Sequence, residues 1–78
     1  MKRAIVAIMR EAWGDLPESS LGEIEDYARR ILHMALNGES KAAIEEYVAA
    51  RQHAFGIASP TAYKDIVARA IALVSTSN

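Results

Sequence analysis

Apolar residues recur along the chain at intervals of three and four positions, in four stretches separated by glycine-containing breaks. This spacing places them on one face of an α-helix, because a helix repeats every 3.6 residues. There is no internal repeat and no second domain. We therefore expect an all-α fold, a compact four-helix bundle formed by a single domain over residues 1–78, with helices over residues 2–13, 20–36, 41–55 and 60–75.

Each break combines a residue that ends one helix with a residue that starts the next. The breaks are Trp13-Gly14-Asp15-Leu16-Pro17, Asn37-Gly38-Glu39-Ser40 and Phe55-Gly56-Ile57-Ala58-Ser59-Pro60. Glycine past a helix end adopts the left-handed conformation without steric cost, and serine caps the following helix. Ser20 with Glu23 is a candidate capping box, and Ser40 is the expected cap of the third helix.

The lengths of the breaks predict how the helices run. The second and third connections are short, so the last three helices should run antiparallel to their chain neighbours. The longer first connection leaves the first helix freer to cross the others. The second helix has the widest apolar face and should be central.

The apolar faces supply the candidate core. In helix order its members are Ile5, Val6, Ile8, Met9, Ala12 and Trp13; Leu21, Ile24, Tyr27, Ala28, Ile31, Leu32, Met34, Ala35 and Leu36; Ile44, Tyr47, Val48, Ala54 and Phe55; and Tyr63, Ile66, Val67, Ala70, Ile71, Leu73 and Val74. Arg51 interrupts the third face. A buried guanidinium without a partner would be very costly, so Arg51 must reach solvent, pair with a carboxylate such as Glu11 or Asp26, or face a partner molecule.

Composition narrows the function classes. The chain has 78 residues, and 15 of its apolar residues are alanine, so the core is small and dimerisation or a partner would stabilise it. It has no cysteine, which excludes disulfides, cysteine zinc sites and thiol nucleophiles. The apolar run after Lys2-Arg3 is too short for a signal peptide, and no window approaches a membrane span. We expect a cytoplasmic protein with no membrane association.

Charge argues against a nucleic-acid partner. The net charge is −1, with an acidic middle over residues 14–38 flanked by basic ends, which is typical of a solvated surface. Residues 55–64 resemble the turn and recognition helix of a helix-turn-helix. That motif usually has a small residue where this chain has Gln52 and an aliphatic residue where it has Asp65, and only Lys64 and Arg69 could anchor phosphates. DNA binding is therefore the weakest alternative.

No residue pattern indicates catalysis. His33 and His53 each follow a carboxylate, Asp26 and Glu46, by two helical turns, whereas metal ligands on one helix usually lie three or four residues apart. The chain has neither a Gly-x-Ser-x-Gly nucleophile turn nor a glycine-rich phosphate loop. We therefore assign no catalytic, cofactor-binding or metal-binding residue and expect no cofactor.

A family resemblance runs through nearly the whole chain. It is carried by Trp13-Gly14-Asp15-Leu16-Pro17, Asp26-Tyr27-Ala28 with Ile31-Leu32, Leu36-Asn37-Gly38-Glu39-Ser40, Ile44-Glu45-Glu46-Tyr47 and Phe55-Gly56. In this order they resemble a family of small bacterial helical proteins of unknown function. In that family the tryptophan is followed directly by Asn or Asp and then Pro, and here Gly14 and Leu16 are inserted. The resemblance implies a four-helix fold and transfers no catalytic residue.

These observations favour a noncatalytic protein-interaction module, of the immunity or antitoxin type, that binds a protein partner or a second copy of itself. The candidate interaction residues are Trp13, Asp15, Tyr27, Tyr47 and Arg51, because Trp, Tyr and Arg dominate interface energetics. The same residues could instead pack at the edge of the core. The competing function is a small ligand-binding or enzymatic domain, which a polar-lined pocket with converging His, Tyr or acidic groups would favour.

Overall fold

The computed structural model describes residues 1–14 and 16–76, apart from the side chain at position 18. It consists of four α-helices, α1 (Lys2–Trp13), α2 (Leu21–Leu36), α3 (Lys41–Phe55) and α4 (Ala62–Thr76), with a short 3₁₀ helix, η1 (Glu18–Ser20), before α2. The all-α four-helix prediction is confirmed. Within the described ranges, no helix has the length and apolar character needed to cross a membrane.

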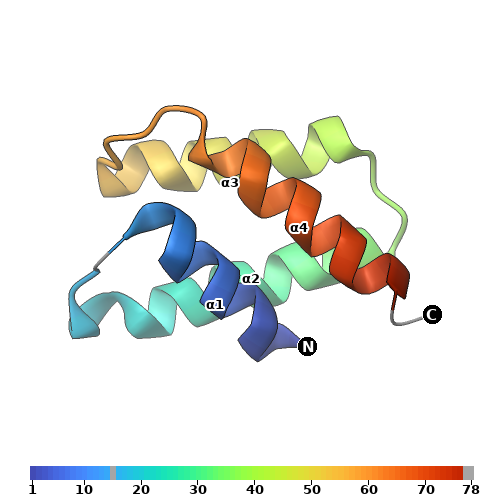
Figure 1. Ribbon diagram of the computed structural model, residues 1–78, viewed down its shortest axis with the longest axis horizontal. Coiled ribbons are helices and arrows are strands. Elements are labelled where there is room, and N and C mark those ends of the chain that lie inside the picture. Colours follow the sequence, from blue (N-terminus) through green and yellow to red (C-terminus); the bar gives the residue numbers. More distant parts are fainter. Residues whose placement is uncertain (15, 77–78) are drawn as a thin grey trace.

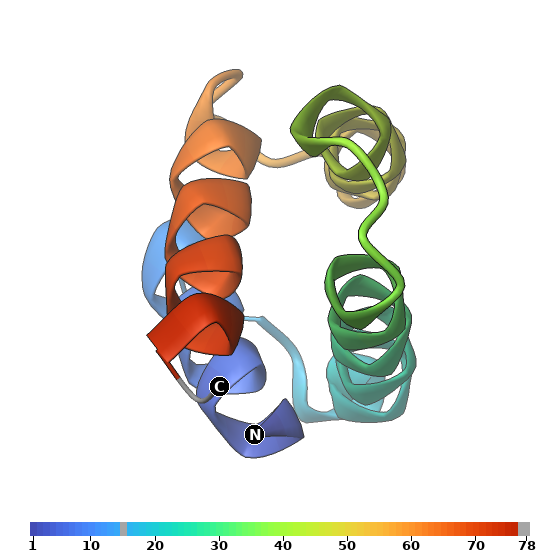
Figure 2. The same ribbon diagram turned by 90° about the vertical axis from the view of Figure 1, so that its right-hand side faces the viewer.

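The four helices pack as two pairs. Viewed from one end, α1 and α4 lie on one side and α2 and α3 on the other (Figure 2). Successive helices alternate in direction, so the last three run antiparallel to their chain neighbours as expected, and α1 and α4 are inclined to α2 and α3 (Figure 1). Both α2 and α4 pack against all three other helices, whereas α1 and α3 are diagonal neighbours whose backbones do not touch.

The core lies where the four apolar faces meet. Its largest fully buried side chains are Ile5, Met9, Ile24, Ile31, Ile44, Val48, Ile66 and Val67. The predicted faces are correct for these positions and wrong at two others. Leu36, the last residue of α2, is 55% exposed, because the helix ends beyond the reach of its neighbours. Ala54 is also exposed, because α3 turns Gln52 toward the core instead.

The helix ends follow the predicted signals in part. The Ser40 hydroxyl accepts a hydrogen bond from the Ala43 amide at 3.1 Å, and Gly56 adopts the left-handed conformation with φ of 68°. Both are the predicted roles. Ser20, however, makes no side-chain cap bond. Its own backbone is helical, because η1 runs directly into α2, so the predicted capping box is not formed.

Gln52 bonds the backbone of the loop just before α4. Its Nε2 donates to the backbone oxygens of Ser59 at 2.9 Å and Pro60 at 3.1 Å. In a helix beginning at Pro60 these oxygens would accept from backbone amides of the first turn. The Ser59 oxygen also accepts from the Ala62 amide at 3.4 Å, in a turn that precedes α4, and α4 begins at Ala62, two residues later than predicted.

Gln52 also connects the diagonal pair of helices. The side chain is only 5% exposed, and its Oε1 accepts a hydrogen bond from the indole Nε1 of Trp13 at 3.1 Å. One amide group thus joins α1, α3 and the loop before α4. Its place in the core matches its spacing, because it follows Ile44 and Val48 at intervals of four residues.

We predict that Gln52→Ala destabilises the protein by about 2–4 kcal/mol, because the substitution leaves the buried Trp13 N–H and the two loop oxygens without this partner. Chemical denaturation would measure the loss. The matched control is His53→Ala, an exposed position on the same helix, which should change stability by less than about 0.5 kcal/mol. Equal stability of the two variants would contradict this role for Gln52.

Candidate functional site

Four of the five predicted interaction residues lie together. The rings of Trp13 and Phe55 are 5.6 Å apart between centroids, those of Phe55 and Tyr27 5.8 Å, and those of Tyr27 and Tyr47 6.4 Å. We call the set of Trp13, Phe55, Tyr27, Tyr47 and Arg51 the aromatic cluster. It begins at α1 and continues between α2 and α3. The fifth candidate, Asp15, lies outside the described residues.

Arg51 lies against the two tyrosines. Its guanidinium carbon is 5.5 Å from the centroid of Tyr47 and 5.8 Å from that of Tyr27, within the range of a cation–π contact. The side chain is half-buried, and its Nε atom is buried without a hydrogen-bond partner. The part of the third apolar face that surrounds Arg51 is therefore aromatic, and its tyrosine rings accommodate the positive charge.

The predicted ion pairs of Arg51 are not formed. Glu11 pairs with Arg69 at 3.0 Å, and Asp26 pairs with Arg29 at 3.3 Å. Within the described part of the chain, no carboxylate lies within ion-pair distance of Arg51. The reason is geometric, because Arg51 extends along the space between α2 and α3, while Glu11 lies on the other side of the bundle with α4.

The two tyrosines have perturbed ionisation. Burial raises the pKa of Tyr27, and the hydrogen bond that its hydroxyl donates to Glu23 at 3.1 Å raises it further. Burial also raises the pKa of Tyr47, while the positive charges of Arg51 and Arg30 act to lower it. Both phenols are therefore neutral at physiological pH, and the Tyr27 hydroxyl already donates its hydrogen to Glu23.

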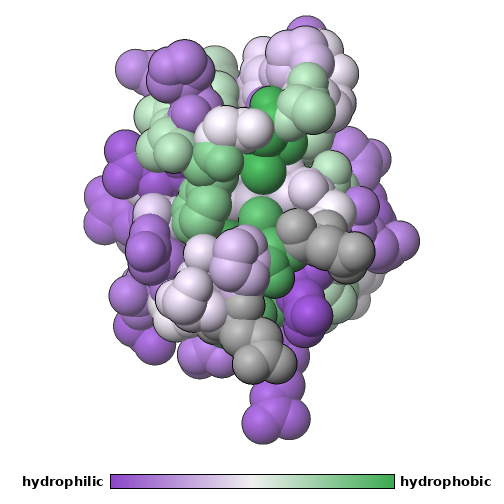
Figure 3. Space-filling model, turned by 90° about the vertical axis from the view of Figure 1, so that its left-hand side faces the viewer, coloured by the Kyte–Doolittle hydropathy of each residue, from purple (hydrophilic) through white to green (hydrophobic). Residues whose placement is uncertain are grey.

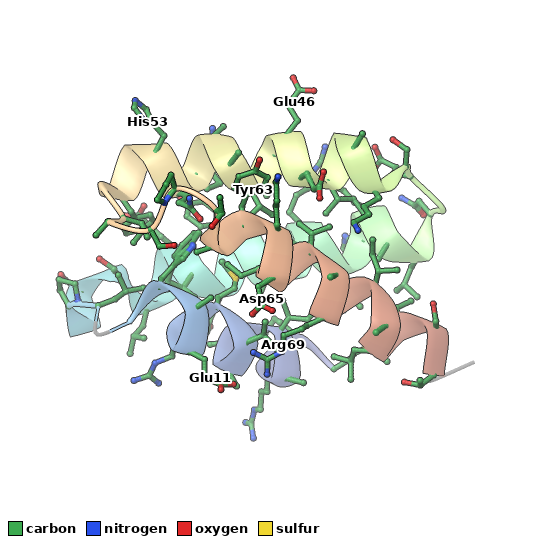
Figure 4. All side chains as sticks on the ribbon, turned by 45° about the horizontal axis from the view of Figure 1, so that its top comes forward. Glu11, Glu46, His53, Tyr63, Asp65 and Arg69 are labelled. Atoms are coloured by element: carbon green, nitrogen blue, oxygen red, sulfur yellow. The ribbon has the colours of Figure 1, made fainter. Side chains whose placement is uncertain are left out.

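The other polar groups show no converging arrangement. His53 and Glu46 point away from the bundle on the outer face of α3, and Glu11, Asp65 and Arg69 form an exposed ion-pair group where α1 meets α4 (Figure 4). Exposed pairs of this kind contribute little to stability. Among the described residues, no three His, Asp or Glu side chains lie close enough to hold a metal ion.

Two ends of the molecule carry apolar surface. At the end shown in Figure 3, apolar side chains form a stripe between more polar surfaces. At the opposite end there is a cavity of about 340 Å³ between the α2–α3 turn and α4. Its described lining contains two charged residues, Glu39 and Lys41, and no His or Tyr.

No family model, curated protein or solved structure matches this chain. The resemblance to a family of small bacterial helical proteins therefore stays a prediction.

We predict that Arg51→Met changes stability by no more than about 1 kcal/mol. The substitution loses the cation–π contacts, but it keeps an apolar stem of similar length and removes a buried N–H without a partner. Equilibrium denaturation in urea provides the measurement. A loss above about 3 kcal/mol would contradict this and would show that the arginine belongs to a structural ion pair.

We predict that the same substitution raises the pKa of Tyr27 and Tyr47 further, because the Arg51 charge favours their ionised forms. A spectrophotometric titration in a Tyr63→Phe background would follow these two phenols alone. Because both pKa values are raised by folding, the unfolded chain ionises first, near 10.0, and stability falls as pH rises from that value through the folded pKa values. An unchanged titration curve in Arg51→Met would contradict the contact.

Proposed function

We propose that this chain is a noncatalytic protein-interaction module whose partner binds the accessible part of the aromatic cluster, Tyr27, Tyr47 and Arg51, where α2 and α3 meet. The observation that supports this proposal is the state of Arg51. It lies on two tyrosine rings, half-buried, with no carboxylate among the described residues to balance it. Arginine and tyrosine are also the residue types that most often carry interface energy.

The chemistry of the cluster indicates the chemistry of the partner. A guanidinium presents a planar set of N–H donors that matches a carboxylate, and the tyrosine rings beneath it exclude water and hold it in place. Burial raises the pKa of Tyr47, and the charges of Arg51 and Arg30 act to lower it. We infer that the partner offers an Asp or Glu side chain to Arg51 and an apolar surface to the rings.

The small size of the chain and its lack of catalytic groups suit a protein that sequesters another, as immunity proteins and antitoxins do. Under this proposal the protein acts in the bacterial cytoplasm. A second copy of the chain is an alternative partner, because the α2 surface beside the cluster carries acidic residues such as Glu23 and Asp26. Light scattering at high protein concentration would separate the two cases.

The test is a comparison of captured proteins. The immobilised wild-type chain and its Arg51→Glu variant would be exposed to extract from the native cell, and the retained proteins identified and quantified. We predict that Arg51→Glu retains about tenfold less of the specific partner, because a reversed charge repels a carboxylate. Circular dichroism would confirm that the variant is folded.

Two matched substitutions serve as controls. Arg10→Glu reverses an exposed arginine on α1, and Tyr63→Ala truncates a half-buried tyrosine outside the cluster. Both should retain the partner, whereas Tyr47→Ala should lose it. If every variant captures the same proteins in the same amounts, or if the wild type captures nothing specific and does not self-associate, the proposal is wrong.

A further inference from the structure

The cavity at the α2–α3 turn has the size and lining of a small-molecule site. Its volume of about 340 Å³ lies at the lower end of the range of about 300–1,000 Å³ that is usual for ligand pockets. The aliphatic part of the lining includes Ile44, which is fully buried, Val74, and Ile71. Figure 2 faces this end of the molecule, where α2 turns into α3 and α4 ends.

Two opposite charges line the cavity beside this aliphatic surface. Glu39 lies in the turn after α2, and Lys41 is the first residue of α3. Both residues are exposed, and within the described ranges neither forms an ion pair or a side-chain hydrogen bond. Neither charge is neutralised by the fold, so both are available to a ligand.

Both charges lie in the short connection where two helix ends meet. Glu39 follows the negative pole of α2 but directly precedes Ser40, the cap of α3, so the two helix ends act on it with opposite sign. Lys41 is the first residue of α3, where the positive pole disfavours a cation, and the first turn of α3 contains no acidic residue to offset this.

We propose that this cavity binds the zwitterion of a small aliphatic amino acid. The ligand's carboxylate pairs with Lys41, its ammonium group pairs with Glu39, and its aliphatic side chain packs on Ile71 and the accessible edge of Val74. The N-terminus of α3 adds partial positive charge beside the ligand's carboxylate. The site lies away from the aromatic cluster and does not depend on the proposed interaction function.

The test uses L-leucine as the probe, followed by amide chemical-shift changes in the full chain. We expect saturable shifts confined to residues 38–44 and 71–75. Isovalerate lacks the ammonium group, isopentylamine lacks the carboxylate and glycine lacks the aliphatic group. Each should bind about tenfold more weakly, because each loses one of the three contacts.

Two substitutions test the assigned charges. Lys41→Gln and Glu39→Gln should each weaken L-leucine binding about tenfold, whereas Lys64→Gln, at the far end of α4, should leave it unchanged. Lys41→Gln should not lower the midpoint of thermal unfolding, because it removes a charge that the helix end disfavours. Arg51→Glu should still bind L-leucine, which separates this test from that of the interaction function.

Three results would overturn the proposal. One is the absence of saturable shifts with L-leucine. Another is isovalerate or isopentylamine binding as tightly as L-leucine, which would show that the cavity recognises a single charge. The third is equal binding by the Lys41→Gln and Lys64→Gln variants.

Discussion

The arrangement of this bundle depends on one buried amide group. Gln52 accepts from the Trp13 indole and donates to the Ser59 and Pro60 carbonyls, so a single side chain connects helices whose backbones do not touch. A buried amide is tolerated in an apolar core only when its donors and acceptors are paired, and here both ends of the group are. The same bonds hold α1 against α3 and direct the chain into α4.

Burial of Gln52 also creates the aromatic cluster. Successive residues of a helix project about 100° apart, so turning Gln52 toward the core turns Arg51 toward the edge that α3 shares with α2. There it meets Tyr27 and Tyr47. Trp13, held by its bond to Gln52, packs on Phe55 and completes the row of rings. The surface proposed to bind a partner is therefore a consequence of how the buried Gln52 amide finds its hydrogen-bond partners.

The four helices could be predicted because apolar periodicity and glycine signals are local. Ser40 and Gly56 act as expected for the same reason. The bonds from Gln52 to the loop before α4 could not be predicted, because they join residues of different elements. The polarity of Gln52 also concealed a core position that its spacing indicated. Residue type alone identified Trp13, Tyr27, Tyr47 and Arg51 as candidates. Their mutual contacts, the lack of an ion pair at Arg51 and the cavity could not be predicted, because they depend on how the helices pack together.

The hydrogen bonds of Gln52 differ greatly in the length of chain that they close. Those to Ser59 and Pro60 span seven and eight residues, whereas that from Trp13 spans 39. Closing the longer segment costs about 1.4 kcal/mol more chain entropy than closing the shorter one. We therefore expect the corner between α3 and α4 to assemble early in folding and the Trp13–Gln52 bond, which ties α1 to α3, to form late. That bond would then be among the first to open when the native bundle fluctuates, so the diagonal tie between α1 and α3 is more easily broken than the corner at Ser59 and Pro60.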